Sequence, residues 1–168
     1  MIGAAYCVQM AQYNAWQNIQ LTPFLNALPD AEFSRDRGAF FGSIKATLNH
    51  LLWGDTIWMS RFDGGAAPSV GIPESSNYAP DLATWIAMRG ETDARIQTWA
   101  NGLQDSDLAG DLTWYSGAAG AEMTKSRALC VMQLFNHQTH HRGQVHAMLT
   151  ATGSKAPVSD LPFMPEPE

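Results

Sequence analysis

The sequence predicts an all-α fold, a four-helix bundle with a long crossover loop and a small β-hairpin before the last helix. Apolar residues recur at steps of three and four over four long segments, which is the period of amphipathic helices. The segment 63–80 interrupts this pattern with three glycines and three prolines, and helix bundles often contain one such long connection. The chain of 168 residues has the length of one ordinary domain, and no repeat or linker divides residues 1–168.

The first helix is predicted over residues 4–28. Its apolar and aromatic residues keep helical spacing, and glycine and proline are absent between positions 4 and 22. Pro23 predicts a kink or an early stop, because proline lacks the backbone N–H that the helix needs. Residues 29–38 are expected to form a polar connection.

The second helix is predicted over residues 40–62, where Leu48, Leu51 and Trp58 help to form a wide apolar face. His50 lies on an adjoining stripe of the same helix. Gly54 in the helix interior costs about 1 kcal/mol relative to alanine. This cost is explained if another backbone or a ligand approaches there, although simple tolerance of the glycine is an equal alternative.

Capping residues and a glycine-rich turn predict the boundaries of the remaining helices and of the hairpin. The third helix is expected to start at Asp81, a good N-cap, and to stop near Gly102. Residues 111–115 and 121–124 flank a glycine-rich turn and predict the hairpin. The fourth helix is predicted from about Ser126 to a C-cap near Gly153. The proline-rich tail 155–168 is expected to pack back onto the bundle through its apolar side chains, which are Val158, Leu161, Phe163 and Met164.

Charge and composition exclude several classes of partner. The net charge is −6, from 10 basic and 16 acidic residues, so nucleic acid is not an expected partner. No apolar run reaches the about 18 residues needed to cross a bilayer, and no secretory signal is present. The two cysteines are few and far apart, as expected for a cytoplasmic protein. Cys7 and Cys130 are expected to be buried, and Cys130 lies two turns before His137, too far to share a ligand site.

Four of the five histidines lie between positions 137 and 146. His137 and His141 are one turn apart on the apolar face of the predicted fourth helix, so their imidazoles are able to bind one metal ion. The residue after His137 is Gln138, so the general base of the metalloprotease motif HExxH is absent. Two core histidines with ordinary hydrogen-bond partners are the alternative.

His50 is the candidate for a third ligand, because helix bundles build metal sites from side chains on facing helices. Three neutral imidazoles leave open positions on a divalent ion, which is a catalytic rather than a structural pattern. Zinc or nickel are the expected occupants, although the ligand type does not separate them from iron or copper. The ion would activate either water or a thiol.

No catalytic residue is assigned beyond these ligands. Asp55 is the best acid on the second helix, but a buried hydrogen-bond acceptor is the simpler interpretation. Gln144 either orients a ligand or is a polar residue at the core margin. Arg142 is expected to pair with an acid on a neighbouring helix. His140 lies beside the ligand face of its helix and is able to support a ligand, whereas His146 points away toward a surface or a subunit contact.

Four segments of this sequence together resemble the DinB/YfiT-like helix-bundle family, and they are 13–16 (YNAW), 33–44 (FSRDRGAFFGSI), 48–52 (LNHLL) and 134–146 (LFNHQTHHRGQVH). The resemblance implies a bundle of up-down-down-up topology, a homodimer, and a divalent metal held by three histidines. Matched residue by residue, those ligands are His50, His137 and His141.

The family resemblance leaves the reaction open. Some members transfer low-molecular-weight thiols or isomerise thiol adducts, and others are described as metal-dependent hydrolases. The resemblance therefore implies a hydrolase or an S-transferase with a small-molecule substrate. Two alternatives remain, a non-catalytic, stress-linked metal-binding dimer and a metal-free bundle with core histidines.

Overall fold

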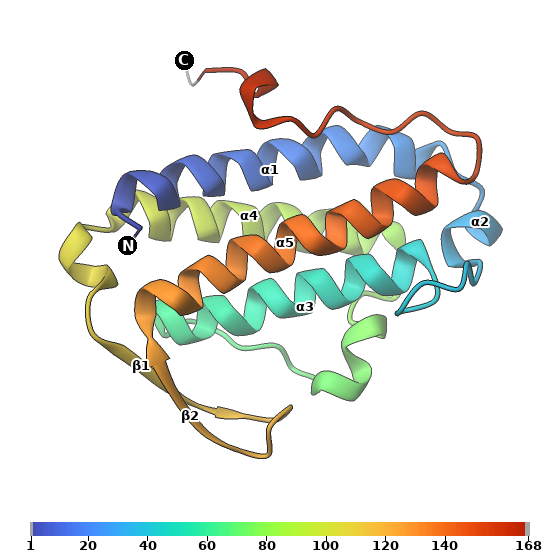
Figure 1. Ribbon diagram of the computed structural model, residues 1–168. Coiled ribbons are helices and arrows are strands. Elements are labelled where there is room, and N and C mark those ends of the chain that lie inside the picture. The colour runs from blue at the N-terminus through green and yellow to red at the C-terminus, as the bar shows by residue number, and fades with distance from the viewer. Residues whose placement is uncertain (1, 167–168) are drawn as a thin grey trace.

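The computed structural model describes residues 2–166 and contains four long helices packed as a bundle (Figure 1). The long helices are α1 (Ala4–Asn26), α3 (Ile44–Asp63), α4 (Leu82–Gly102) and α5 (Arg127–Thr150). The short helices are α2 (Asp30–Ser34) and the 3₁₀ helices η1 (Ile72–Asn77), η2 (Asp105–Leu108) and η3 (Leu161–Phe163). The predicted all-α bundle is confirmed. No helix within residues 2–166 is long and apolar enough to cross a membrane.

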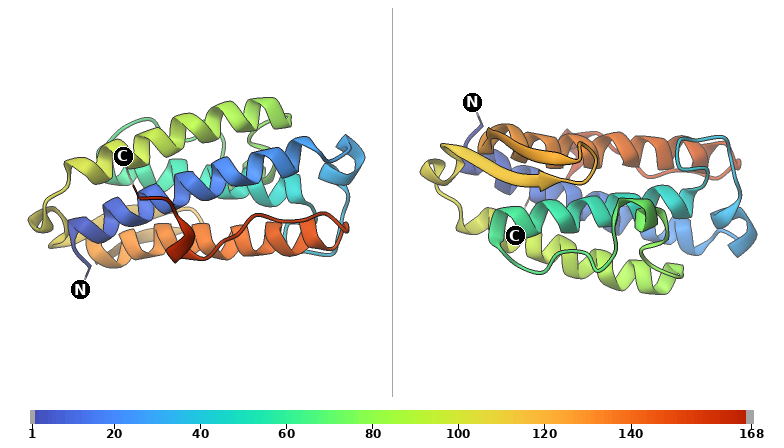
Figure 2. Two further views of the ribbon diagram at one scale, coloured as in Figure 1. Left: turned by 90° about the horizontal axis from the view of Figure 1, so that it is seen from above. Right: turned by 90° about the horizontal axis from the view of Figure 1, so that it is seen from below.

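The helices follow the expected up-down-down-up order. In Figures 1 and 2, α3 and α4 run in the same direction, and α1 and α5 run in the opposite one. Two helices in sequence can be parallel only if their connection returns along the bundle, so the segment 63–80 is a crossover. It contains η1, which the aperiodic sequence did not predict. Helix α1 packs mainly on α4, and α3 packs mainly on α5.

Capping side chains fix several helix ends. The Asp81 carboxylate accepts a hydrogen bond from the Thr84 N–H at 2.8 Å, and the Ser126 hydroxyl accepts one from Leu129, so both predicted starts are confirmed. Helix α3 begins at Ile44 rather than near residue 40, because Ser43 caps it. Helix α1 continues through Pro23 for one turn and ends at Asn26. The expected polar connection 29–38 contains the short helix α2.

The predicted hairpin is present. Strands β1 (Asp111–Ser116) and β2 (Ala121–Ser126) pair antiparallel, with Trp114 opposite Met123. Leu112 in β1 is buried in the core, which anchors the hairpin to the bundle end where α5 begins. The turn of the hairpin reaches toward η1 (Figure 1), and an added Cβ at Gly117 would lie 3.4 Å from Cδ1 of Ile72.

The C-terminal tail lies along the bundle, but not by the predicted means (Figure 2). Val158, Leu161 and Phe163 remain exposed, so the expected apolar packing is wrong for these three side chains. The tail is attached through its backbone instead. The Tyr13 hydroxyl donates to the Ser159 carbonyl at 2.5 Å, and the Gln17 amide donates to the Val158 carbonyl at 3.0 Å. An extended, proline-rich segment keeps its carbonyls free to accept such bonds.

Two apolar clusters form the core, one at each end of the bundle. The cluster near the hairpin includes Met59, Phe62 and Leu134, and the cluster at the opposite end includes Leu25, Leu48 and Trp85. Both predicted buried cysteines, Cys7 and Cys130, belong to the first cluster.

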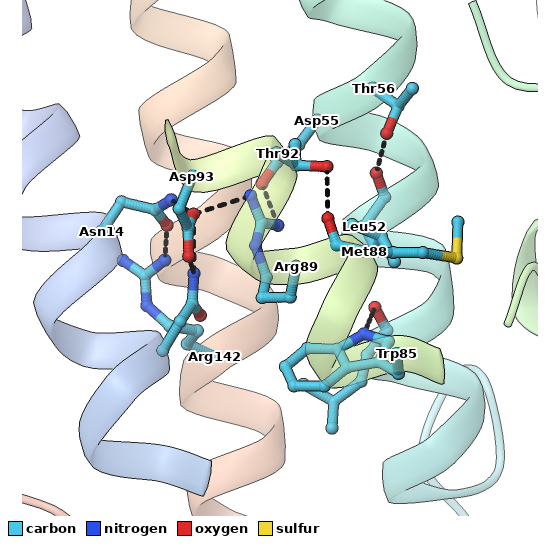
Figure 3. Close-up of polar contacts among 12 residues, drawn as sticks. Asn14, Leu52, Asp55, Thr56, Trp85, Met88, Arg89, Thr92, Asp93 and Arg142 are labelled. Atoms are coloured by element: carbon cyan, nitrogen blue, oxygen red, sulfur yellow. Dashed lines mark hydrogen bonds and ion pairs between the residues drawn. The ribbon is translucent and has the colours of Figure 1, made fainter. Parts of the chain in front are cut away.

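A buried polar layer occurs midway along the helices (Figure 3). Arg89 of α4 lies 2.6 Å from the Asp55 carboxylate of α3 and 2.7 Å from Asp93 one turn further along α4. Asn14 of α1 donates to Asp93, and its amide oxygen accepts from Arg142 of α5. Asp55 is therefore a buried ion-pair partner. Arg142 binds an amide rather than the expected acid, because Asp93 and Asp55 are already held by Arg89.

Removing the central cation of this layer should strongly destabilise the fold. Arg89→Ala leaves the buried carboxylates of Asp55 and Asp93 without their ion-pair partner, and breaking a buried pair in this way costs about 3–5 kcal/mol. Urea unfolding measures this loss. The control is Arg35→Ala, whose side chain is 62% exposed and whose ion pair with Glu32 contributes less than about 1 kcal/mol. A loss below 1 kcal/mol for Arg89→Ala would show that the layer does not hold the bundle together.

Candidate metal centre

The structure brings together the three histidines that the sequence selected. His50 comes from α3, and His137 and His141 come from α5, the helix that packs beside it. One ring nitrogen from each histidine can be chosen so that all three lie within 4.8 Å of one another. The Nε2 atoms of His137 and His50 are 3.3 Å apart. Residues separated by 87 positions in the chain thus converge on one point.

Gly54 provides the space for this convergence. A Cβ at position 54 would lie 2.7 Å from Cε1 of His137, which is closer than real contacts of this kind. The mid-helix glycine therefore has a packing reason, and the group that approaches it is a side chain rather than a backbone or a ligand. His137 is positioned by this packing, because its buried Nδ1 has no hydrogen-bond partner within residues 2–166.

Hydrogen bonds orient the other two rings. Nδ1 of His50 lies 3.0 Å from the Ser75 hydroxyl, and Nδ1 of His141 lies 2.7 Å from Oε1 of Gln144. The amide oxygen only accepts hydrogen bonds, so Nδ1 of His141 donates and its Nε2 is left with a lone pair. Supporting contacts of this kind fix the orientation of metal-ligating histidines. Gln144 therefore has the orienting role that the sequence left open.

Ser75 is the functional residue that sequence reasoning missed. It lies in η1, within the aperiodic segment 63–80, and no spacing pattern relates it to His50. The structure holds this segment against α3 at several points. The Trp53 indole donates to the Val70 carbonyl at 2.9 Å, and the Asn49 side chain bonds both backbone groups of Ala79. Ser75 is 2% exposed as a result.

All three rings are kept neutral by their surroundings. Burial, with a smaller effect from His141, lowers the pKa of His50 to about 4. Burial and the neighbouring histidines lower the pKa of His137 to about 3. Burial also lowers the pKa of His141, and its hydrogen bond to Gln144 partly opposes this. Neutral imidazoles are the form that binds a metal ion, so the site is in a binding state at neutral pH.

The donor set fits a divalent first-row ion. In a tetrahedral site with metal–nitrogen bonds of about 2.0–2.1 Å, neighbouring ligand nitrogens lie about 3.3–3.4 Å apart. The distance of 3.3 Å between Nε2 of His50 and Nε2 of His137 agrees with this geometry. Three imidazoles leave at least one position for a water or a substrate atom.

A cavity of about 400 Å³ opens beside the three histidines. Its lining residues come from the segment before α3, from α3, from η1 and from α5, and they are Phe40, Phe41, His50, Ile72, Ser75, His140, His141 and Gln144. The Phe41 ring stacks on the His50 ring with centroids 4.1 Å apart. His140 is exposed, and its Nε2 lies 3.2 Å from Nε2 of Gln144, the residue that contacts His141. His146 lies elsewhere, in a cavity beneath the C-terminal tail.

An up-down-down-up helix bundle with three converging imidazoles beside a cavity defines a class of helix-bundle protein that could hold a metal ion. The model of the DinB family matches residues 1–168, so the chain belongs to the DinB family. The chain is also similar to Protein DinB of Bacillus subtilis (strain 168), with 21% identity over 156 residues that cover 92% of this chain and 91% of that protein. The family resemblance seen in the sequence motifs is confirmed.

Substituting Gly54 should weaken metal binding without unfolding the protein. In Gly54→Ala the added methyl group displaces the His137 ring, and loss of a contact that orients a metal ligand typically costs about 10–100-fold in affinity. Titration with Zn²⁺ against a competing chelator measures the change.

Gly143→Ala is the matched control, since it makes the same change in α5 where no atom lies within 4 Å of the new Cβ. Its affinity should equal that of the wild type. A Gly54→Ala protein that binds Zn²⁺ within about threefold of the wild type would contradict the packing role of Gly54.

The metal affinity should resist mild acid. An exposed imidazole has a pKa of about 6.5, but the pKa values of His50 and His137 are lowered to about 4 and about 3. The pKa of His141 is lowered as well, so protons compete with the ion less than they would at three exposed histidines, and the affinity should fall at a lower pH than at such a site. Zn²⁺ titrations between pH 8 and pH 4 test this.

Circular dichroism at each pH is the control for these titrations. The unfolded chain binds protons at His50, His137 and His141 below about pH 6.5, whereas burial lowers the pKa of these three rings in the folded metal-free chain, so the stability of that form also decreases as the pH falls. A tenfold loss of affinity between pH 7 and pH 6 in the folded protein would contradict the lowered pKa values.

Proposed function

We propose that the protein is a metal-dependent enzyme that acts on a small molecule. A divalent ion, zinc or nickel, would be held by His50, His137 and His141. The observation that supports this proposal is the convergence of three neutral imidazoles beside a cavity that is open to solvent. Catalytic zinc sites keep three protein ligands and an open position, whereas structural sites are closed by a fourth.

The ion would supply Lewis acidity, which lowers the pKa of a water or a thiol at neutral pH. The chain's own residues do the positioning. Ser75 and Gln144 hold the His50 and His141 rings in the orientation for ligation. Gly54 lets His137 reach the same point. Phe41 covers one face of His50 and excludes water from it.

Of the two nucleophiles, a low-molecular-weight thiol is the better supported. The cavity lining contains no carboxylate to act as a general base on water. A thiol needs no such base, because coordination alone is enough to deprotonate it. In the proposed S-transferase reaction the thiol proton passes to solvent and a sulfur–carbon bond forms. The leaving group of the electrophile departs with the bonding electron pair.

Hydrolysis is the second candidate, and His140 is the observation that favours it. Its imidazole lies exposed at the cavity rim, where a water beside the proposed ion would be within its reach.

A non-catalytic, stress-linked metal-binding dimer is the alternative outside the enzyme class. It is motivated by the lack of a reactive cysteine. Cys7 and Cys130 are both buried, and burial raises the pKa of Cys7 to about 11.

Whether or not the protein is an enzyme, we propose that it forms a homodimer, which is supported by the exposed apolar residues Leu129 and Met132 on α5. Sedimentation velocity tests the dimer.

Alanine substitution of the three histidines tests the proposed function. His50→Ala, His137→Ala and His141→Ala should each weaken metal binding by at least about 100-fold and abolish transfer of a thiol to a model electrophile. The fold should persist, because the apolar clusters at both ends of the bundle are untouched and each large buried side chain contributes about 1.5–3 kcal/mol. Elemental analysis, a coupled thiol assay and thermal unfolding provide the three readouts.

His146→Ala is the matched control, since His146 lies in α5 away from the site. Activity that survives all three substitutions would show that the metal mechanism is wrong. Unfolding of all three variants would show that the ion is structural.

A further inference from the structure

The cavity beside the histidines is lined by side chains without permanent charge. None of its lining residues is lysine, arginine, aspartate or glutamate. Away from the proposed ion, a carboxylate, a phosphate or an ammonium on the ligand would lose hydration there without gaining a counter-charge from a side chain of the lining. In the segment that precedes the cavity residues Phe40 and Phe41, Glu32 forms ion pairs with Arg35 and Arg37.

The polar atoms of the lining are also occupied. The Ser75 hydroxyl is bonded to His50, and the Gln144 amide is bonded to His141 and lies within 3.2 Å of His140. These groups hold the histidine rings, so they have little capacity left to bind a polar substrate. Apart from the exposed His140 ring, the surface that remains for recognition is apolar.

Two phenylalanines are presented to this cavity by a tight turn. The Arg37 N–H donates to the Gly42 carbonyl at 2.7 Å, and the Gly42 N–H donates to the Ala39 carbonyl at 2.8 Å. Gly42 has a φ of +79°, which favours glycine. The turn places Phe41 on the His50 ring and leaves Phe40 85% exposed at the cavity rim.

The exposure of Phe40 is unusual for so large an apolar side chain. Its ring meets the Phe41 ring edge to face, with centroids 4.8 Å apart, and both rings line the cavity. Ile72 of η1, 39% exposed, belongs to the same lining. The turn of the hairpin supports Ile72 from behind at Gly117. These three side chains form an apolar wall above the metal centre, and we call them the rim (Phe40, Phe41 and Ile72).

We propose that the substrate of this site is a small molecule with an uncharged aromatic or alkyl body, which packs against the rim and offers a single donor atom to the ion. This inference rests on the proposed function and names the substrate class for it. Aromatic rings prefer edge-to-face or offset contacts of the kind that Phe40 and Phe41 already make with each other. A substrate ring is therefore a suitable partner for the exposed face of Phe40.

The test compares two thiols that differ in one charge, phenylmethanethiol and its para-carboxylate. The protein is loaded with Co²⁺, and each thiol is titrated under anaerobic conditions while the thiolate-to-cobalt absorption band is followed. Phenylmethanethiol should bind at least about tenfold more tightly than the carboxylate, because the thiol occupies the ion and the carboxylate at the far end of the ring meets a lining without lysine or arginine.

Phe40→Ala should weaken the binding of phenylmethanethiol by about tenfold and that of the carboxylate by less, since the benzyl body loses its rim contact. The side chain is mostly exposed, so the fold should not change. Phe163→Ala is the matched control, because Phe163 is also exposed, at 69%, but lies in η3 within the C-terminal tail. Its affinities should equal those of the wild type.

The outcomes separate this inference from the proposed function. If Co²⁺ is bound and the carboxylate binds as tightly as phenylmethanethiol, or if Phe40→Ala changes neither affinity, the substrate class is wrong and the metal function stands. If neither thiol alters the cobalt spectrum, both the thiol function and the substrate class are overturned. If Co²⁺ itself binds equally well to His50→Ala and His137→Ala, the proposed metal centre is wrong.

Discussion

The close approach of α5 to α3 at Gly54 is the constraint on which the candidate site depends. A side chain any larger than hydrogen at this position would occupy the space that the His137 ring fills. With the ring in place, its Nε2 lies 3.3 Å from that of His50. The conformational cost of a glycine within α3 is therefore offset by a contact between two helices, and that contact sets the spacing of the ligands.

Two residues of the buried polar layer are the immediate sequence neighbours of residues in the candidate site. Asp55 follows Gly54 on α3, and Arg142 follows His141 on α5. Arg89 and Asp93 of α4 complete the layer, which separates the two apolar clusters of the core (Figure 3). Apolar contacts tolerate sliding of one helix along another, whereas ion pairs and hydrogen bonds fix a register. We infer that the layer holds the helices in the register that the three histidines require.

The connections between the helices supply further residues of the candidate site. The crossover supplies Ser75, which orients His50, and Ile72, which lines the cavity. The turn before α3 supplies Phe41, which covers the His50 ring. Rigid helices thus carry the ligands, while shorter segments determine the shape and polarity of the space above them. Such segments vary readily within a fold, so in the proposed function they would decide which substrate the site accepts.

The sequence by itself determined the features that arise from neighbours along the chain. Helical periodicity placed His137 and His141 on one face, and Asp81 marked the start of α4 as a cap, because both depend on residues within about four positions. The site's supporting contacts, such as Ser75 on His50, join segments far apart in the chain and leave no spacing signal. Only the packing of the helices and the course of the crossover decided them, and the same packing gave Arg142 an amide partner instead of an acid.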